Sequence, residues 1–320
     1  MFITVAICTF NRAESLRRTL ASLVAMQVPS DVTWEVVIVN NNSTDHTDDV
    51  ISEYVGRLPV RPEFEPRTGK SNALNRAIDV ANGDYILWID DDVLVDVGWL
   101  TAYVETFRRW PEGVVFGGRI RPRYDSPVEK WIIESESLLA WPYGIRDFGD
   151  DVLSLSVNDQ GHFPYGANWA IRAAEQRAFR YDTRLGPGSN IRLGEETDVI
   201  QRLLGAGATG YWIPGAIVEH CIRREMQTLR YIAAWYESWG ESVAFHAADT
   251  IVAASFWFGV PRRIWFRLLV WGTFYHCCRF ICPTSVWVKY LGAYHKNKGI
   301  RRYWLQKSEI SRGPKVENAA

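Results

Sequence analysis

The sequence predicts an α/β protein with a mostly parallel central sheet and flanking helices, followed by a helical C-terminal region. Short apolar runs rich in Val, Ile and Leu alternate with segments whose apolar residues recur at helical spacing, which is the βαβ pattern of a parallel sheet. Charge separates the two parts, because residues 221–320 hold fifteen Lys and Arg against six Asp and Glu, although the whole chain has a net charge of -1. We therefore expect two domains, 1–220 and 221–320, that face different partners.

The composition is that of a folded protein with a sizeable core. A chain of 320 residues with 47% hydrophobic and 23% charged residues is long enough for one large α/β domain and an appended region. Its five cysteines are an odd number without paired spacing, which argues against a disulfide framework and for a reducing compartment. Asn11 and Arg12 interrupt the first apolar run, so that run predicts a strand and not a signal peptide.

The first elements follow one another as strands and helices in alternation. Phe2–Thr9 is a compact β-branched run, and residues 13–25 then carry apolar side chains at helical spacing. The same alternation repeats twice, with further elements predicted at 34–39, 46–57, 60–65 and 73–81. Because a polar loop follows each strand, we expect several polar loops to gather at one edge of the sheet.

The next strand, which begins near Tyr85, ends in three consecutive carboxylates, Asp90, Asp91 and Asp92. Ligands of open α/β sheets bind outside the carboxyl ends of the strands, so these acids can face a site while the strand stays dry. Adjacent carboxylates repel one another unless a cation or a hydrogen-bond donor compensates them. If the extended geometry continues, Asp90 and Asp92 point the same way and offer two oxygen ligands to Mg²⁺ or Mn²⁺. The alternative is a solvated acidic turn after a core strand.

The polar loops carry groups suited to a nucleotide. Asn40 offers an amide for a base edge, Asp45 a carboxylate for a ribose, and Lys70 a cation for phosphate. Each also has a local explanation, since Asn-rich loops commonly cap helices and Ser71 or Asn72 can serve as an N-cap. Their coincidence with the acid cluster favours the nucleotide site.

Taken together, four stretches resemble the family-2 glycosyltransferases, which have the Rossmann-like GT-A fold. These stretches are Thr9-Phe10-Asn11-Arg12, residues 39–45, residues 69–75 and the triple Asp, and the resemblance covers residues 2–220. It implies that the first two loops hold the base and ribose of a nucleotide-sugar and that aspartates hold Mn²⁺ or Mg²⁺ on the diphosphate. The implied donor-binding residues are Thr9, Phe10, Asn11, Arg12, Asn40, Asn42, Asp45, Lys70, Asn75, Asp90 and Asp91, and the implied metal ligands are Asp92 and Asp90. This chain departs from the family at Asn40, where the family usually has Asp.

A second acidic pair, Glu195 and Glu196, stands at the head of a predicted helix that runs to Leu204. Carboxylates at this position complement the helix dipole, which is the structural explanation. The resemblance implies that the pair supplies the general base, with Glu196 as the candidate and Glu195 as the runner-up. It also places His220, at the exit of the last predicted strand, near the metal as a ligand. The alternative for His220 is a structural role.

The middle segment has a weaker assignment to the acceptor side. Arg119 and Arg121 alternate beside Pro122, and a Gly-Ala-Asn stretch at 166–168 is similar to one that lies beside the transferred sugar in the family. The alternatives are a solvated strand face for the arginines and a core position for Trp169.

The final hundred residues interleave aromatic side chains with Arg and Lys. Residues 264–282 form an apolar run of nearly membrane-spanning length, but Arg267, His276 and Arg279 interrupt it. A helix in the headgroup plane fits better, because Trp and Tyr favour the interface and the cations suit anionic lipid. We therefore expect residues 228–304 to contact a membrane surface. The alternative is a helical subdomain that packs against protein.

The resemblance and the residues together predict an inverting, metal-dependent glycosyltransferase. Its expected donor is a nucleotide-sugar, with a UDP-sugar favoured, and its expected acceptor is a hydroxyl of a polysaccharide or a lipid-linked saccharide. We expect a cytoplasmic protein, peripheral on the inner face of the plasma membrane, with no nucleic-acid partner. Two alternatives stay open: a nucleotidyltransferase, which usually needs a glycine-rich triphosphate loop that residues 9–12 lack, and a catalytically silent scaffold of the same fold.

Overall fold

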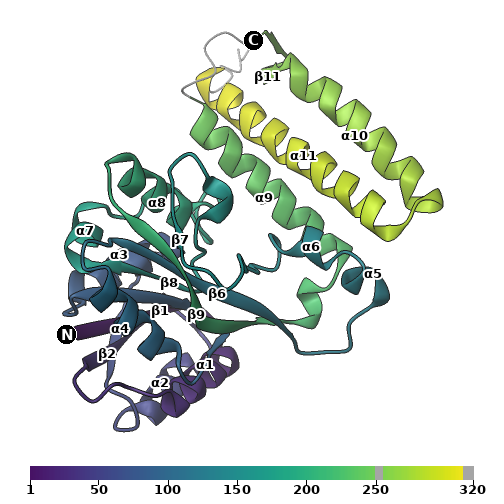
Figure 1. Cartoon of the computed structure of the whole chain (residues 1–320). Helices are drawn as coiled ribbons and strands as arrows, with labels where there is room; N and C mark the ends of the chain where they lie inside the picture. Colours follow the sequence, from purple (N-terminus) through teal and green to yellow (C-terminus); the bar gives the residue numbers. More distant parts are fainter. Residues whose placement is uncertain (249–254, 313–320) are drawn as a thin grey trace. The chain divides into compact units, whose positions relative to one another are not determined.

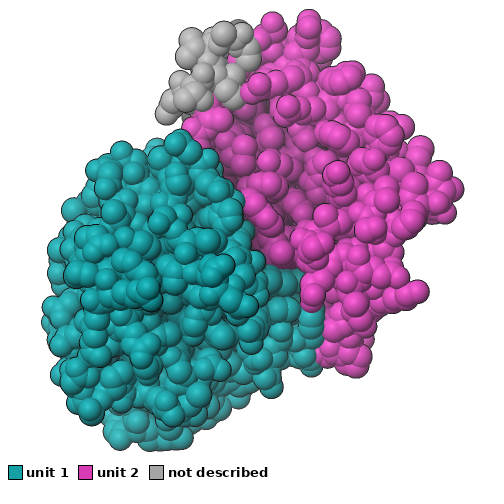
Figure 2. All heavy atoms as spheres, in the orientation of Figure 1, with its two compact units in different colours: residues 1–125, 143–190, 194–222 teal, residues 126–142, 191–193, 223–320 magenta. Residues whose placement is uncertain are grey.

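The computed structural model describes residues 1–248 and 255–312, which fall into two compact units (Figure 2). Unit 1 comprises residues 1–125, 143–190 and 194–222. Unit 2 comprises 126–142, 191–193 and the described residues from 223 onward. Two short segments that the sequence analysis assigned to the first domain thus belong to the second unit.

Unit 1 is built on a central sheet whose parallel strands meet at one edge. Within the described residues its strands are β1 (Phe2–Thr9), β2 (Thr33–Asn40), β3 (Val60–Phe64), β4 (Tyr85–Asp90), β5 (Val93–Val95), β6 (Val115–Tyr124), β7 (Leu153–Ser154), β8 (Trp169–Arg172) and β9 (Gly210–Ile222). The order is β3-β2-β1-β4-β8-β6-β9-β5, and β7 pairs with β9. Strands β3, β2, β1 and β4 are parallel, whereas β8 runs antiparallel to β4 and β6. The predicted mostly parallel sheet is confirmed, and β8 is a reversed strand inserted between β4 and β6.

Helices cover both faces of this sheet (Figure 1). They are α1 (Ala13–Ala25), α2 (Thr47–Tyr54), α3 (Lys70–Val80), α4 (Trp99–Arg109), α7 (Ala173–Ala178) and α8 (Glu195–Gly205), with a 3₁₀ turn at Gln160–His162. Successive side chains of a strand point to opposite faces, so Val5 and Ile7 of β1 pack with α1 and α4 while Ala6 packs with α3 and α8. The strands are dry on both sides, which explains their continuous apolar runs.

Strand register brings the polar loops together. Thr9 at the end of β1 pairs with Asn40 at the end of β2, and Cys8 pairs with Asp90 at the end of β4. Because these three strands are parallel, the loops that follow them leave the same edge of the sheet. This edge is the ligand crevice that the topology predicts.

Unit 2 is built on three long helices, α9 (Leu229–Ala247), α10 (Arg262–Ile281) and α11 (Thr284–Arg312). Helix α11 lies between the other two (Figure 1). Its smaller elements are α5 (Lys130–Ile133), α6 (Glu136–Leu139), η2 (Arg224–Met226), β10 (Phe256–Trp257) and β11 (Val260–Pro261). None of the helices described here has both the length and the apolar character that a bilayer crossing requires.

Two glycines allow α9 and α11 to approach closely. A Cβ on Gly240 would lie 2.0 Å from the carbonyl oxygen of Lys296, and a Cβ on Gly299 would lie 1.9 Å from that of Glu237. Glu237 also pairs with Lys298, with Arg302 and with the Nδ1 of His295. Backbone proximity and this ion cluster therefore hold the two helices together.

Candidate active site

The triple Asp does not continue as an extended strand. Strand β4 ends at Asp90 and the chain turns through Asp91 and Asp92 before β5 begins. The carboxylate of Asp90 accepts a hydrogen bond from Lys70 Nζ at 2.8 Å, whereas Asp91 and Asp92 each accept one from Arg12 Nη1 at 2.9 Å. The expectation that Asp90 and Asp92 point the same way required an extended backbone through Asp92. Because the chain turns instead, Asp90 contacts Lys70 and Asp92 contacts Arg12.

Asp91 and Asp92 lie deeper than Asp90. Asp91 also accepts a hydrogen bond from the hydroxyl of Thr9 at 2.7 Å. Burial raises the pKa of Asp91 to about 6, although the Arg12 guanidinium opposes the rise. The side chain of Asp90 is 28% exposed and is thus the member of the triplet that a ligand can reach most readily.

His220 stands beside the acid cluster. Its Nδ1 donates to the carbonyl oxygen of Tyr143 at 2.6 Å, and its Nε2 lies 3.3 Å from Asp92 Oδ1. A carbonyl oxygen can only accept, so the Nδ1 contact requires a proton on that nitrogen. Burial lowers the pKa of His220, but the Asp92 carboxylate outweighs this effect and the pKa is raised overall. The structure thus brings His220 to the predicted metal ligand Asp92.

The first two loops hold each other in place. Asn11, in the left-handed region at φ 50°, accepts a hydrogen bond from the backbone N–H of Thr44 at 2.7 Å. Asp45 accepts from the N–H groups of Ala13 and Thr47, so it links the start of α1 to the start of α2. The amide of Asn40 accepts from the Ser43 N–H and donates to Asp48.

These contacts show how the predicted donor-binding residues are placed. Asn40, Asn11 and Asp45 are brought together as predicted, but their polar groups form hydrogen bonds within and between the loops. Phe10 is exposed in the first loop, and Asn42 takes a positive φ of 66° in the second. A ligand at this edge would meet loops that are already ordered.

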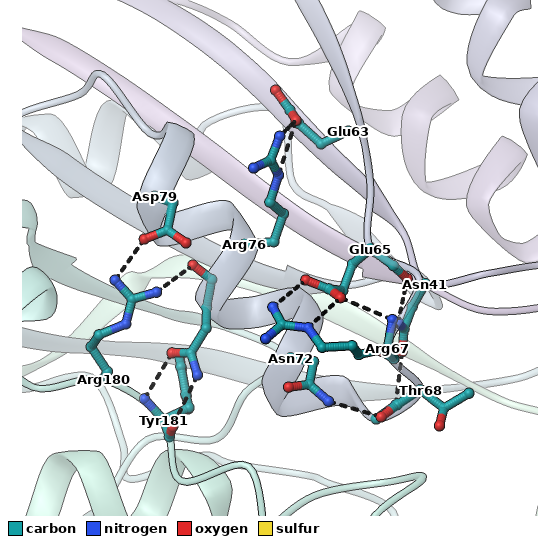
Figure 3. Close-up of polar contacts among 12 residues, drawn as sticks. Asn41, Glu63, Glu65, Arg67, Thr68, Asn72, Arg76, Asp79, Arg180 and Tyr181 are labelled. Atoms are coloured by element: carbon teal, nitrogen blue, oxygen red, sulfur yellow. Dashed lines mark hydrogen bonds and ion pairs between the residues drawn. The ribbon is translucent and has the colours of Figure 1, made fainter.

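Sequence reasoning missed Asn41, which shapes the third loop (Figure 3). Its buried amide donates to the carbonyl oxygens of Glu65 and Arg67 at 2.9 and 2.7 Å and accepts from the N–H of Gly69 at 3.1 Å. It therefore fixes the backbone directly before Lys70. The three consecutive asparagines signal a structured loop, but nothing in their pattern tells which one points inward.

Asn75, one of the predicted donor-binding residues, is used elsewhere. Its amide donates to the carbonyl oxygen of Tyr181 and accepts from the N–H of the same residue, both at 3.0 Å. Arg180 binds Asp79 and the carbonyl oxygen of Asn75 beside it (Figure 3). Asn75 thus joins α3 to the segment after α7, and it does not line the pocket described next.

Lys70 and the second acidic pair meet around one pocket. Lys70 Nζ lies 3.5 Å from Glu195 Oε1 in addition to its bond with Asp90. Glu196 Oε1 accepts from the N–H of Gly166 at 3.4 Å. The pocket is lined by Cys8, Lys70, Leu74, Trp88, Ile89, Asp90, Gly166, Trp169, Tyr181, Glu195 and Glu196. Residues from β1, α3, β4, β8 and α8 thus converge at the strand ends.

The two glutamates have different surroundings. Glu195 is buried, and burial together with the neighbouring Glu196 raises its pKa to about 8, against a lowering by Lys70. Glu196 is half-buried at the pocket. Burial lowers the pKa of Lys70, but Asp90, Glu195 and Glu196 outweigh it and raise the pKa well above its ordinary value. The pocket therefore has a permanent cation and one carboxyl that holds a proton at neutral pH.

The loop formed by residues 185–190 is tied to the start of α3. The N–H of Lys70 donates to the carbonyl oxygen of Pro187 at 2.8 Å, and the Ser71 hydroxyl donates to that of Leu185 at 2.7 Å. A Cβ on Gly188 would lie 3.0 Å from the Cα of Gly69. These contacts hold the loop on α3, directly before the acidic pair.

The acceptor-side residues of the sequence analysis lie mostly in the core. Asn168 is fully buried: its amide oxygen accepts from Trp99 Nε1 and the Tyr103 hydroxyl, and its nitrogen donates to the carbonyl oxygens of Arg119 and Ala216. Trp169 is buried in the core, which confirms the core position that the sequence analysis gave as its alternative. Arg119 is also buried, and it pairs with Asp147 and Asp150. The solvated-face alternative for Arg119 is therefore wrong.

The donor groups fit a hard divalent cation that arrives with a substrate. Among the described residues, no three His, Cys, Asp or Glu side chains are arranged as a complete metal site. Mg²⁺ and related cations are often held by one or two carboxylates together with substrate phosphates, so a complete protein site is not required. Asp90 lines the pocket, and Asp92 with the neighbouring His220 supplies further oxygen and imidazole donors of the right kind.

Comparisons with known proteins found a family profile and several relatives by sequence. The profile of Glycosyl transferase family 2 matches residues 4–174. The succinoglycan biosynthesis protein ExoM of Rhizobium meliloti is 26% identical over 238 residues, which cover 73% of this chain and 71% of that protein. A poly-beta-1,6-N-acetyl-D-glucosamine synthase of Staphylococcus epidermidis is 30% identical over 122 residues, or 37% of this chain and 29% of the synthase.

Solved structures share the fold at low sequence identity. The mannosyltransferase PcManGT from Pyrobaculum calidifontis, in complex with GDP-Man and Mn²⁺, aligns with a TM-score of 0.55 at 17% identity over 97% of this chain and 75% of that one. TarS 1-349 of S. aureus, in complex with UDP-GlcNAc, aligns with a TM-score of 0.53 at 13% identity over 97% of this chain and 92% of that one. The predicted GT-A fold is confirmed.

Proposed function

This chain belongs to glycosyl transferase family 2, and we propose that it transfers a sugar with inversion from a nucleoside-diphosphate sugar to a hydroxyl of a growing polysaccharide or a lipid-linked saccharide. The observation that carries the proposal is the pocket where Lys70, Asp90, Glu195 and Glu196 converge. A cation and an acidic pair within one pocket match the two needs of such a transfer, namely binding a diphosphate and removing a proton.

Glu196 is the proposed general base. It takes the proton of the acceptor hydroxyl, whose oxygen forms a bond to the anomeric carbon as the bond from that carbon to the diphosphate oxygen breaks on the opposite face. Glu196 is half-buried beside the pocket, whereas the buried Glu195 keeps its proton near neutral pH. Glu195 is therefore the second candidate for the general base. Its contact with Lys70 makes it a positioning residue for that lysine.

The leaving diphosphate requires positive charge. Lys70 and Arg12 lie at the strand ends with their charges already balanced by Asp90, Asp91 and Asp92. When bound, Mn²⁺ or Mg²⁺ held by Asp90 and Asp92 with His220 would offset the charge that grows on the departing diphosphate. The Mn²⁺ in the mannosyltransferase structure supports a divalent cation as the cofactor.

The donor base is proposed to be uracil. TarS was solved with UDP-GlcNAc, which supports a UDP-sugar, while the GDP-Man of the archaeal mannosyltransferase is the competing choice. The buried amide of Asn40 donates one N–H to Asp48 and accepts one from Ser43, which leaves its second N–H and its second lone pair for a base edge.

The acceptor is proposed to lie at a membrane surface. The relatives are a succinoglycan biosynthesis protein and a poly-N-acetylglucosamine synthase, both of which concern polysaccharides. The basic, aromatic segment 228–304 is the proposed contact with the inner face of the plasma membrane, since its composition suits anionic lipid.

A ligand panel tests the proposed function directly. UDP-, GDP- and other nucleotide-sugars are added to the full chain with Mn²⁺ or Mg²⁺, and the melting temperature and the release of nucleoside diphosphate are measured. We expect one nucleotide-sugar to raise the melting temperature only with metal present and to be hydrolysed slowly without acceptor. A catalytically silent protein would bind without hydrolysis, and stabilisation by no nucleotide-sugar would contradict the proposal.

A further inference from the structure

Helix α10 is apolar on both of its faces. Its inner face packs on α11, where Ile264 and Tyr275 are buried and a Cβ on Gly272 would lie 3.0 Å from the ring of Tyr294. Its outer face carries large apolar side chains along the length of the helix. These exposed residues are Phe266, Leu269, Phe274, Phe280 and Ile281. A helix at the surface of a soluble protein normally turns mainly polar residues outward, whereas α10 exposes these large apolar side chains beside its arginines.

The exposure of this outer face is large. Phe266 and Leu269 are 68% and 69% exposed, and Phe280 is 83% exposed. Helix α11 lies on the inner side of α10, and α9 lies beyond α11 (Figure 1). Within the described residues, no element of unit 2 covers the outer face. Apolar groups that recur in this way mark an interaction surface.

The hairpin that precedes α10 has an unusual residue in its turn. Strands β10 and β11 are joined by Phe258 and Gly259, which have φ values of 51° and 77°. A two-residue turn with positive φ at both positions favours Asn-Gly, and a bulky residue at the first position is strained. The side chain of the strained Phe258 is 83% exposed, so its ring contact with Trp265 leaves most of it in solvent. Strain of this kind is retained where the residue serves a function.

The hairpin and the start of α10 form one surface. The indole N–H of Trp265 donates to the carbonyl oxygen of Trp257 at 3.1 Å, and the ring of Phe258 meets that of Trp265 edge to face. We call this surface, formed by Phe256–Phe258 and the exposed apolar residues of α10, the outer apolar surface.

Charge indicates what this surface meets. Between residues 255 and 312 the sequence holds eleven Lys and Arg against one acid, Glu309, and α10 itself has no acid. Arg263, Arg267 and Arg279 of α10 are exposed, and none of them forms an ion pair with a described residue. A second copy packed α10 on α10 would set these arginines against one another, whereas an anionic leaflet complements them.

We propose that the outer apolar surface inserts into the headgroup region of an anionic bilayer, with α10 lying in the plane of the membrane and Phe258 at the tip of the inserted hairpin. This inference rests on the membrane association proposed above and identifies which part of the segment 228–304 performs it. Helices α9 and α11 then serve as the support that holds α10 at the surface. Interfacial helices of this kind combine buried apolar area with attraction to anionic lipid.

Vesicle binding by the full chain tests the proposal. Sedimentation is measured with vesicles of phosphatidylcholine and phosphatidylglycerol in equal parts, and with phosphatidylcholine alone. We expect wild-type protein to prefer the anionic vesicles. The double variant Phe266→Gln/Leu269→Gln is expected to bind them at least about tenfold more weakly, since two large side chains lose their apolar burial. Val24→Gln, an exposed valine on α1, is the control and should bind like wild type.

Phe258→Asn separates a binding role from a folding role. Asparagine suits the left-handed position, so the variant should melt at the same temperature as wild type or higher while its vesicle binding falls. A lower melting temperature with unchanged binding would show that Phe258 serves the fold, and would overturn its assignment to the bilayer.

The remaining outcomes distinguish a failure of the outer apolar surface from a failure of the proposed glycosyltransferase activity. If wild type binds anionic vesicles and both sets of variants bind equally well, the outer apolar surface is the wrong part of the segment. If wild type is a dimer that Phe266→Gln/Leu269→Gln converts to a monomer, a second copy occupies the surface and the proposal fails. Donor hydrolysis measured in the same samples reports on the glycosyltransferase activity independently.

Discussion

The pocket of unit 1 and the outer apolar surface of unit 2 depart from the usual distribution of residues in opposite directions. The pocket holds largely buried charges, with Lys70 Nζ 2.8 Å from the Asp90 carboxylate, whereas α10 exposes large apolar side chains such as Phe266. Buried charge and exposed apolar area are each unfavourable in the free protein. The comparison therefore indicates that the two sites bind partners of different kinds. The pocket of unit 1 suits a charged ligand, and the outer apolar surface of unit 2 suits an apolar, anionic surface.

The comparison is tested most strongly by Glu196→Gln. The glutamine keeps the shape but cannot accept the acceptor proton, so we expect transfer to fall by about 10³-fold. Donor-induced stabilisation and vesicle binding should be unchanged. Glu195→Gln is the matched variant, and a larger loss there than at Glu196 would exchange the roles of the two residues.

Asp92→Asn should reduce transfer by about 10²-fold, because the carboxylate that faces Arg12 and His220 loses its charge. The measurement is the initial transfer rate against the concentration of Mn²⁺. Asp49→Asn, an exposed acid on α2, should leave that rate unchanged. If Asp92→Asn showed normal turnover in the presence of a chelator, Asp92 would not be a metal ligand.

Gly299→Ala tests the rigidity of the support in unit 2. The new Cβ would lie 1.9 Å from the carbonyl oxygen of Glu237, so α9 and α11 must separate, and we expect the free energy of unfolding to fall by about 2 kcal/mol. Chemical denaturation measures the change. Gly205→Ala has no atom within 4 Å of its new Cβ and is the control. Equal stability of the two variants would show that the close helix crossing does not matter.

A smaller effect should appear in the pH dependence of stability, with opposite signs in the two units. The pKa of Glu195 rises from 4.5 to about 8 on folding, so the unfolded chain loses this proton first and stability falls as pH rises between those values. The pKa of Glu237 falls to about 2 on folding. Burial alone would raise this pKa, but Lys298, His295 and Arg302 lower it by more than burial raises it. Its contribution is present above pH 4.5 and is lost as pH falls toward 2.

Thermal melts across this pH range check both signs. Glu195→Gln should flatten the decline at the upper end, and Glu237→Gln should remove the dependence at the lower end. A Glu195→Gln profile that declines as steeply as wild type would mean that Glu195 does not carry its raised pKa.

Much of unit 1 was predictable because the hydrophobic period is a local property. The strand at Phe2–Thr9 and the helix at 13–25 have the bounds that the sequence predicts. Helix α3 begins at Lys70, three residues before the predicted start, because Gly69 takes a φ of 116° and Asn41 binds its N–H. Asn72, one of the two residues considered as an alternative N-cap, donates to the carbonyl oxygen of Thr68. A contact across 28 residues of sequence therefore set a boundary that local pattern could not.

The sequence by itself determined the alternation of strands and helices, the acid cluster at the end of one strand and the excess of cations after residue 220. The tertiary structure decided which cation each acid meets, since Arg12 lies 79 residues before Asp91 and the turn after Asp90 redirects the next two carboxylates. It also decided which face of α10 stays exposed. Both faces carry large apolar side chains, and packing against α11 decides which are buried, because burial depends on neighbours that are distant in the chain.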